Sequence, residues 1–294
     1  MQVFHQQYRV ITFVAEGGQG KIFVVEDQVD KTYKVLKLYE YKPSRAMIRY
    51  RPGRVEQQPY LGRLVDKVQE VMPYLSANQR LQRFLANHQE KIQSLEHCCI
   101  LPIEKVILKE PFCFIYPLVR GGTLLAKAQK KRGLNFQEAG VFLAQLANTL
   151  DYLHLRKVFH RDIKPDNILV DKRDRIFLTD FDFAHFRVSE LYDRMLSKKY
   201  CQRGTAYYMS PEHLRGRRPM ETSDVYSLAT TFYYCLALEY PFGEDLQSRE
   251  DLKNYKAVKF LNKRQNNVLK GALEPDPKNR IVDAVTFYKE LYSR

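Results

Sequence analysis

A carboxylate, a lysine and a carboxamide lie within six residues of one another near the middle of this 294-residue chain. They are Asp162, Lys164 and Asn167, and the apolar run Ile168-Leu169-Val170 follows them directly. Transfer of a phosphoryl group from ATP needs a carboxylate that orients the attacking hydroxyl, a cation beside the moving group, and ligands for a divalent metal ion. The types and spacing of these residues therefore suit phosphoryl transfer by a loop that borders a strand.

A second acidic group follows this loop. Asp180 lies thirteen residues after Asn167, behind the short apolar run 176–179, and Asp182 lies two residues further on. Together with the run His160-Arg161-Asp162, this pattern resembles the catalytic and metal-binding loops of eukaryotic-type (Hanks-type) serine/threonine protein kinases. The resemblance extends over about residues 8–292.

The resemblance implies a role for each residue of the two loops. Asp162 and Lys164 are the implied catalytic residues, and Asn167 and Asp180 are the implied ligands of Mg²⁺, with Mn²⁺ as an alternative ion. The family has glycine where this chain has Asp182, so Asp-Phe-Asp is an atypical form of the motif. The sequence leaves open whether the Asp182 carboxylate points away, binds extra metal or restrains the backbone.

Residues that resemble the ATP-binding part of the family come earlier in the chain. The run Glu16–Ile22 resembles the glycine-rich loop, with Ala15 at the first glycine position. Lys37 resembles the third catalytic residue, the lysine that contacts the nucleotide phosphates, whereas the competing Lys34 lies on the opposite face of an extended strand. The residues implied to bind the nucleotide are Gly17, Gly18, Gly20, Ile22, Val35, Lys37, Tyr116, Leu118 and Val119.

The acidic partner of Lys37 is ambiguous. Helical spacing back from Leu95 puts His88 where the family has a glutamate, and Glu90 lies two residues later. Glu90 reaches the lysine only if the helix shifts its register, so both residues stay open. If neither pairs with Lys37, the activity is atypical or depends on a partner that repositions the helix.

The run Gly204–Glu212 resembles the end of the activation segment, which lies on the substrate side of the site in this family. Thr205 together with Lys164 is the combination seen in serine/threonine kinases. The resemblance also implies that Glu212 pairs with Arg280 and that Asp224 braces the catalytic-loop backbone. We further expect the protein to phosphorylate itself within 189–208, where serine, threonine and tyrosine hydroxyls lie beside basic residues.

The elements that must position these residues follow from the apolar pattern. Alternation broken by glycines predicts three antiparallel strands over 9–40 and two more near 103–108 and 112–116. Helical spacing predicts helices at 76–96, 123–131, 136–157, 221–238, 250–269 and 281–292, with strands at 168–170 and 176–179. The predicted fold class is α+β, a two-lobed protein kinase fold with a small antiparallel-sheet N-lobe plus one helix and a larger, mainly helical C-lobe.

We expect a single kinase domain over 1–294, with the N-lobe at about 1–117 and the C-lobe at about 118–294. The segment 41–67 carries seven lysines and arginines against Glu56 and Asp66, and prolines and glycines break it. It is interpreted as a basic insertion in the N-lobe. The whole chain has a net charge of +14 and a pI near 9.4. Together with the insertion, this charge indicates an acidic partner or an anionic surface, or else a solvated basic surface.

The cysteines and apolar runs bear on the compartment. The chain has five cysteines and no C-x-x-C pair, so neither a disulfide framework nor a zinc site is expected. This favours a reducing, cytoplasmic location. No signal peptide is expected from the first residues, and the run Leu228–Leu238 is too short to span a bilayer. Delivery into a host cell stays open.

The leading functional hypothesis is an active, ATP- and Mg²⁺-dependent protein kinase that acts on serine and threonine of protein substrates and on itself. The alternative is a pseudokinase scaffold, which the substitutions at Asp182 and at the helix glutamate favour and the intact catalytic residues oppose. A small-molecule or lipid phosphotransferase is a third hypothesis, against which Lys164 and the run Gly204–Glu212 argue. The sequence names neither the physiological substrate nor the oligomeric state.

Overall fold

The computed structural model describes residues 2–17, 20–39, 77–181, 184–186, 206–217 and 220–293. They divide into two units, Met1–Ser94 with Pro102–Leu118 and Leu95–Leu101 with Val119–Arg294. The basic insertion at 41–67, Gly18, Asp182 and residues 187–205 lie outside the described residues, and so do Thr205 and most of the expected autophosphorylation segment 189–208.

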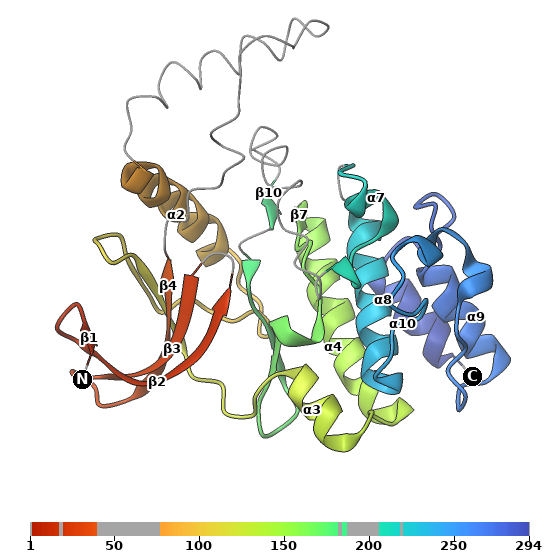
Figure 1. The fold of residues 1–294 in the computed structure, drawn as a ribbon, viewed down its shortest axis with the longest axis horizontal. Coiled ribbons are helices and arrows are strands. Elements are labelled where there is room, and N and C mark those ends of the chain that lie inside the picture. The colour runs from red at the N-terminus through yellow and green to blue at the C-terminus, as the bar shows by residue number, and fades with distance from the viewer. Residues whose placement is uncertain are drawn as a thin grey trace, which may run out of the picture. The chain divides into compact units, whose positions relative to one another are not determined.

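The first unit is built on a six-stranded antiparallel sheet with the order β1-β2-β3-β4-β6-β5 (Figure 1). The expected strands are present, and the short β1, which the sequence did not predict, adds one at the edge. The strands are β1 Val3–Phe4, β2 Tyr8–Gly17, β3 Gly20–Asp27, β4 Tyr33–Tyr39, β5 Lys105–Ile107 and β6 Cys113–Pro117.

One face of this sheet carries a buried apolar cluster. Alternate residues of β3 and β4 enter it, including Phe23, Val25, Leu36 and Leu38. Because side chains alternate along a strand, Lys37 must project from the opposite face, away from this cluster. The burial pattern thus fixes the face from which Lys37 projects.

The helix of the first unit is α2, Ala77–Gln93, close to the predicted 76–96. Leu85 and Ile92 are buried, as expected for one apolar stripe at helical spacing. Glu90 is exposed on this helix. The His88 side chain lies outside the described part of the chain.

The second unit is mainly helical. Its helices are α3 Leu124–Lys131, α4 Phe136–Leu155, the short α7 Pro211–Leu214, α8 Glu221–Ala237, α9 Lys263–Ala272 and α10 Ala284–Tyr292. Asn135 starts α4 with a capping box, in which its side chain and that of Glu138 each bond the other residue's backbone N–H. Figure 1 shows α4 alongside α8, whose residues are almost all buried.

Two small antiparallel pairs interrupt these helices. The hairpin of β8 Ile168–Val170 and β9 Ile176–Leu178 matches the predicted strands, and the single 3₁₀ turn Pro165–Asn167 precedes it. β7 Val158–Phe159 pairs with β10 His185–Phe186, which the sequence did not predict. β7 ends directly before His160 and β8 begins at Ile168, so these two strands flank the loop that carries Asp162.

The helix predicted at 250–269 is wrong. Its first part forms the 3₁₀ turns Gln247–Glu250 and Leu252–Asn254 and irregular chain, and α9 begins only at Lys263. The buried Asn266 side chain accepts from the backbone N–H of Val258 at 2.9 Å and donates to the Leu261 carbonyl at 3.0 Å. These bonds satisfy backbone groups that a helix would otherwise pair.

Within the described ranges, none of the helices has both the length and the hydropathy that a membrane crossing requires.

Candidate active site

Lys164 and Asn167 both bond to the carboxylate of Asp162. Asp162 Oδ2 accepts from Lys164 Nζ at 2.8 Å and from Asn167 Nδ2 at 2.8 Å. Asn167 Nδ2 also donates to the Asp162 carbonyl at 2.9 Å. Asp162 is only 4% exposed, yet its Oδ1 has no hydrogen-bond partner within the described structure. A buried carboxylate oxygen without a partner is costly, so Oδ1 is the atom that a donor from outside would satisfy.

The loop backbone is held by Asp224 at the start of α8. Asp224 Oδ1 accepts from the Arg161 N–H at 2.8 Å, and Oδ2 accepts from the His160 N–H at 2.9 Å. His154 Nε2 lies 2.9 Å from Oδ2. Arg161 has φ = 69°, a left-handed conformation that costs a non-glycine residue about 1–3 kcal/mol. The bracing role predicted for Asp224 is confirmed, and it compensates this strain.

His160 connects this loop to the strand before Asp180. Its Nδ1 accepts from the Asp162 N–H at 3.3 Å, and its Nε2 lies 3.1 Å from the Thr179 carbonyl. Burial lowers the pKa of His160, so the ring is neutral, as these two bonds require. The ring of Phe181 packs edge-on against it with centroids 4.7 Å apart.

Asp180 is half-buried and has φ = 65°. Aspartate tolerates this left-handed conformation better than most residues, which suits it to the turn after β9. The Thr179 N–H donates to the Asn167 carbonyl at 3.0 Å, so the backbone next to Asp180 is bonded to Asn167 itself.

These residues fit a divalent cation. Both described hydrogen bonds of the Asn167 side chain use its NH₂ group, which leaves the carbonyl Oδ1 as a ligand atom. This oxygen and the Asp180 carboxylate are both hard oxygen donors of the kind that Mg²⁺ prefers.

In the first unit, Lys37 lies on β4, paired with Ile22 of β3 and Phe114 of β6. Its Nζ lies 5.3 Å from the centroid of the Tyr39 ring. The competitor Lys34 forms ion pairs with Glu104 at 2.7 Å and Asp30 at 3.4 Å. The hydrogen bond that Lys34 donates to Glu104 raises the pKa of Lys34. Lys34 is therefore engaged at another place on the sheet.

The expected nucleotide-binding residues of this unit lie on neighbouring strands. Gly17 pairs with Gly20 across the β2–β3 hairpin, and the half-buried Val35 pairs with Val24 and Tyr116. A Cβ on Gly20 would lie 1.8 Å from the Leu38 carbonyl oxygen, so contact with β4 already requires glycine there. Ile22 and Tyr116 on these strands and Leu118 after β6 are half-buried, and so is Val119, which belongs to the second unit.

The expected ion pair of Glu212 and Arg280 within the second unit is confirmed. Arg280 Nη1 donates to Glu212 Oε1 at 2.7 Å, and Nη2 donates to Oε2 at 2.9 Å. Ser223 Oγ adds a bond of 2.8 Å to Oε1. This fork-to-fork geometry anchors α7, which overlaps the end of the run Gly204–Glu212.

Sequence reasoning missed Arg249. It is 2% exposed, and its Nη1 donates to the carbonyls of Ala206 at 2.7 Å and Met209 at 2.8 Å. It also lies 5.7 Å from the ring centroid of Tyr207, which stacks on Tyr240. No motif marks an arginine in a 3₁₀ turn, so only the structure shows that Arg249 holds the backbone of residues 206–209.

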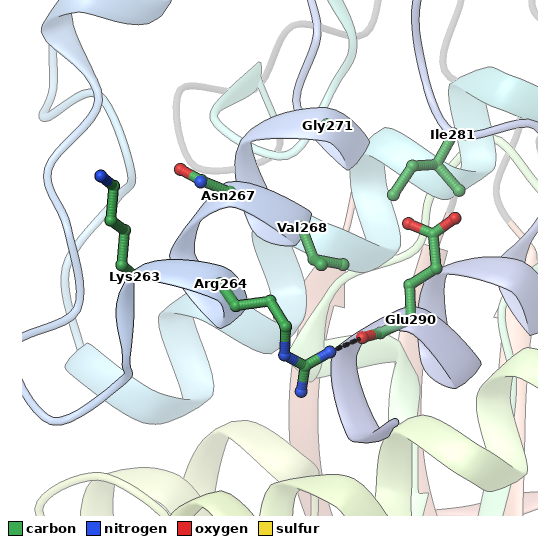
Figure 2. Close-up of a pocket in the computed structure, with 7 residues that line it drawn as sticks. All are labelled: Lys263, Arg264, Asn267, Val268, Gly271, Ile281 and Glu290. Carbon is green, nitrogen blue, oxygen red and sulfur yellow. Dashed lines mark hydrogen bonds between the residues drawn. The ribbon is translucent and has the colours of Figure 1, made fainter. Parts of the chain in front are cut away.

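A hollow of about 560 Å³ lies elsewhere in the second unit, over α9 and α10 (Figure 2). Its lining contains none of the residues discussed above as catalytic or metal-binding. Arg264 crosses it and donates to the Glu290 carbonyl at 2.6 Å, which ties α9 to α10.

Comparison with known families decides the assignment. The model of the protein kinase domain matches residues 73–290 of this chain. The chain belongs to the protein kinase family. The predicted fold class is thereby confirmed, since an antiparallel-sheet unit with one described helix and a mainly helical unit are the two parts of that fold.

Relatives with curated names are serine/threonine and cyclic-nucleotide-dependent kinases. A RAC-beta serine/threonine-protein kinase of Homo sapiens is 29% identical over 183 residues, which is 61% of this chain and 37% of that protein. A cGMP-dependent protein kinase of Eimeria tenella is 30% identical over 190 residues, 62% of this chain and 18% of that protein. A CBL-interacting serine/threonine-protein kinase of Arabidopsis thaliana is 29% identical over 197 residues, 65% of this chain and 43% of that protein. The matches thus span less than half the length of each relative.

Proposed function

We propose that this chain is a serine/threonine protein kinase that transfers the γ-phosphoryl group of ATP to hydroxyls of protein substrates. The observation that carries the proposal is the buried Asp162 carboxylate, whose Oδ2 is held by Lys164 and Asn167 while Oδ1 has no partner among the described residues. A substrate hydroxyl that donates to Oδ1 would be oriented for attack on the γ-phosphorus.

The neighbours of Asp162 then have separate roles. Lys164 holds Asp162 in place and supplies positive charge beside the transferred group. Asn167 and Asp180 would hold Mg²⁺, or Mn²⁺ in its place, which neutralises charge on the phosphates. The neutral His160 and the carboxylate of Asp224 keep the loop backbone in position.

In the first unit, Lys37 is proposed to bind the α- and β-phosphates, and the hairpin around Gly17 and Gly20 to lie against the triphosphate. These residues precede the matched range 73–290, so their roles rest on the strand pattern and on Lys34 being engaged with Glu104. We expect Lys37→Met to abolish phosphotransfer and Lys34→Met to preserve it.

Serine and threonine are the proposed acceptors because Thr205 occurs together with Lys164 and because the named relatives include serine/threonine kinases. A reducing compartment is proposed because the four described cysteines are free. An acidic protein or anionic surface is the proposed partner of the basic insertion 41–67.

The test is incubation of the purified chain with radiolabelled ATP, Mg²⁺ and a generic basic protein. Asp162→Asn should lower the rate by about two or more decades. Asp174→Asn is the matched control, since it removes an exposed carboxylate that pairs with Lys127 in the same unit. Comparable rates for Asp162→Asn and the unaltered chain would refute the assignment of Asp162.

A pseudokinase scaffold is the second candidate, because Glu90 is exposed on α2 and Asp182 replaces the usual glycine. Nucleotide binding without turnover, with either metal ion, would support it. Turnover that Asp162→Asn abolishes would exclude it.

A further inference from the structure

Three potential metal ligands lie together in the segment Leu95–Leu101, which belongs to the second unit although it follows α2 in the chain. One ligand atom each from His97, Cys98 and Cys99 lies within 4.8 Å of the other two. The two sulfur atoms are 3.8 Å apart. The sequence suggested no zinc site, because the cysteines are adjacent rather than spaced as a C-x-x-C pair.

The sulfur separation fits joint ligation of a metal. Two thiolates bound to a tetrahedral ion at about 2.3 Å lie about 3.8 Å from each other. A disulfide would need sulfurs about 2.05 Å apart and Cα atoms more than about 4.4 Å apart, whereas adjacent Cα atoms are only about 3.8 Å apart. Metal binding therefore suits this pair better than oxidation.

The imidazole is already in the form that a metal requires. Its Nδ1 accepts from the Cys99 N–H at 3.2 Å, so Nδ1 carries the lone pair and Nε2 the proton, and a metal ion at Nδ1 would replace this hydrogen bond. The His97 ring is half-buried. The Tyr152 ring, with its centroid 4.9 Å away, packs against it.

The two thiols differ in access. Cys98 is exposed and offers a path of entry, whereas Cys99 is buried. A bound cation would displace the protons of both thiols. Two thiolates would cancel the charge of one divalent ion, so the loaded cluster would be neutral in its partly buried setting.

We propose that His97 Nδ1 and the thiolates of Cys98 and Cys99 bind one Zn²⁺, with water as the fourth ligand. Two zinc–sulfur bonds and one zinc–nitrogen bond form, and the two thiol protons pass to solvent. The ligand set is of the kind that zinc selects, three protein groups and an open position.

The cluster is bonded to the strand that leads to Asp180. The Leu178 N–H of β9 donates to the Cys99 carbonyl at 2.7 Å, and the Leu101 N–H donates to the Leu178 carbonyl at 2.9 Å. Cys99 Sγ lies 4.0 Å from Gln145 Oε1, which accepts from the Ile176 N–H at 3.1 Å. Zinc bound at Cys99 therefore stabilises β9.

The test uses the full chain, stripped of metal with a chelator and kept reduced with a phosphine. Zn²⁺ affinity is measured by competition with a chromophoric chelator, and Co²⁺ serves as a probe because cobalt–thiolate bonds give charge-transfer absorption. Cys98→Ser and His97→Ala are compared with Cys201→Ser, which removes a thiol distant from the cluster in the sequence. Circular dichroism checks that each variant is folded.

We expect one Zn²⁺ per unaltered chain, thiolate absorption with Co²⁺, and slower amide exchange at Ile176 and Leu178 with Zn²⁺ present. Removing a residue that only orients a metal ligand lowers metal affinity by about 10–100-fold. Cys98→Ser and His97→Ala remove ligands themselves, so each should lower Zn²⁺ affinity by about 100-fold, whereas Cys201→Ser should not change it. Equal Zn²⁺ affinity in Cys98→Ser, His97→Ala and the unaltered chain overturns the proposal. Absence of thiolate absorption, or a loss of binding confined to Cys201→Ser, overturns it as well.

Discussion

The buried pair of Glu212 and Arg280 allows a stability prediction with a magnitude. Arg280 is fully buried and Glu212 is 4% exposed, and two parallel hydrogen bonds join them. Arg280 also donates to the carbonyls of Thr222 and Glu274, both at 2.8 Å. The perturbation is Glu212→Gln, which keeps the shape but removes the charge that compensates the guanidinium.

The pKa of Glu212 gives the size of the effect. Burial raises this pKa, but the hydrogen bonds and charge of Arg280 outweigh burial and hold it at about 2, below its ordinary value of 4.5. Since a tenfold change in acid dissociation is worth about 1.4 kcal/mol, this fall corresponds to about 3 kcal/mol of folding free energy. Removal of one partner of a buried pair costs about 3–5 kcal/mol, which agrees.

The sign of the pH dependence follows from the depressed pKa. The contribution of Glu212 is fully present above pH 4.5 and is lost as the pH falls towards 2. Glu212→Gln should therefore lower the free energy of unfolding by about 3 kcal/mol near neutral pH and by progressively less in acid. Its stability curve should approach that of the unaltered chain at low pH.

The assay is urea unfolding followed by far-UV circular dichroism or tyrosine fluorescence, because the chain has no tryptophan. The matched control is Glu221→Gln, whose partner Lys157 is 51% exposed and whose own side chain is 39% exposed. An exposed pair contributes about 1 kcal/mol or less. If both variants lose the same stability, or if the difference for Glu212→Gln does not shrink in acid, the reasoning is refuted.

Three further changes have defined outcomes. Asp224→Asn places an NH₂ group beside the N–H of His160 or Arg161, so we expect a loss of about 2 kcal/mol or more in unfolding free energy together with a lower kcat. Arg249→Met removes the donor to the carbonyls of Ala206 and Met209, and should raise KM for a protein substrate more than it lowers kcat, whereas Arg215→Met on the exposed surface should not. Asp182→Gly should tighten ATP binding and flatten the dependence of rate on Mg²⁺ or Mn²⁺ concentration, and unchanged values would make Asp182 a neutral replacement.

The sequence located the loop and its strands because their signals are local. Asp162, Lys164 and Asn167 lie within six residues, and the structure joins them with bonds of 2.8 Å. β8 and β9 carry apolar runs that predict strands of the observed length. Two-residue strands such as β1 and β7 have too few positions for any period to be visible.

The false helix at 250–269 shows where spacing misleads. Leu252, Tyr255, Val258 and Leu261 recur every three residues, which fits a helical stripe. The same spacing also fits 3₁₀ turns joined by irregular chain, provided that something satisfies the backbone. Asn266 does so from a later helix, and a contact of that kind leaves no local signal.

The roles of the carboxylates around the catalytic loop could not be ranked from the sequence either. Asp224 uses both of its oxygens, on the N–H groups of His160 and Arg161 and on His154. Asp162 is buried to a similar degree but uses only Oδ2, and its Oδ1 has no partner among the described residues. A carboxylate with every oxygen bonded internally stabilises the fold, whereas one with a buried oxygen left over is suited to a hydroxyl supplied by a substrate. Hydrogen-bond capacity, which only coordinates reveal, thus separates the structural aspartate from the one proposed to act in catalysis.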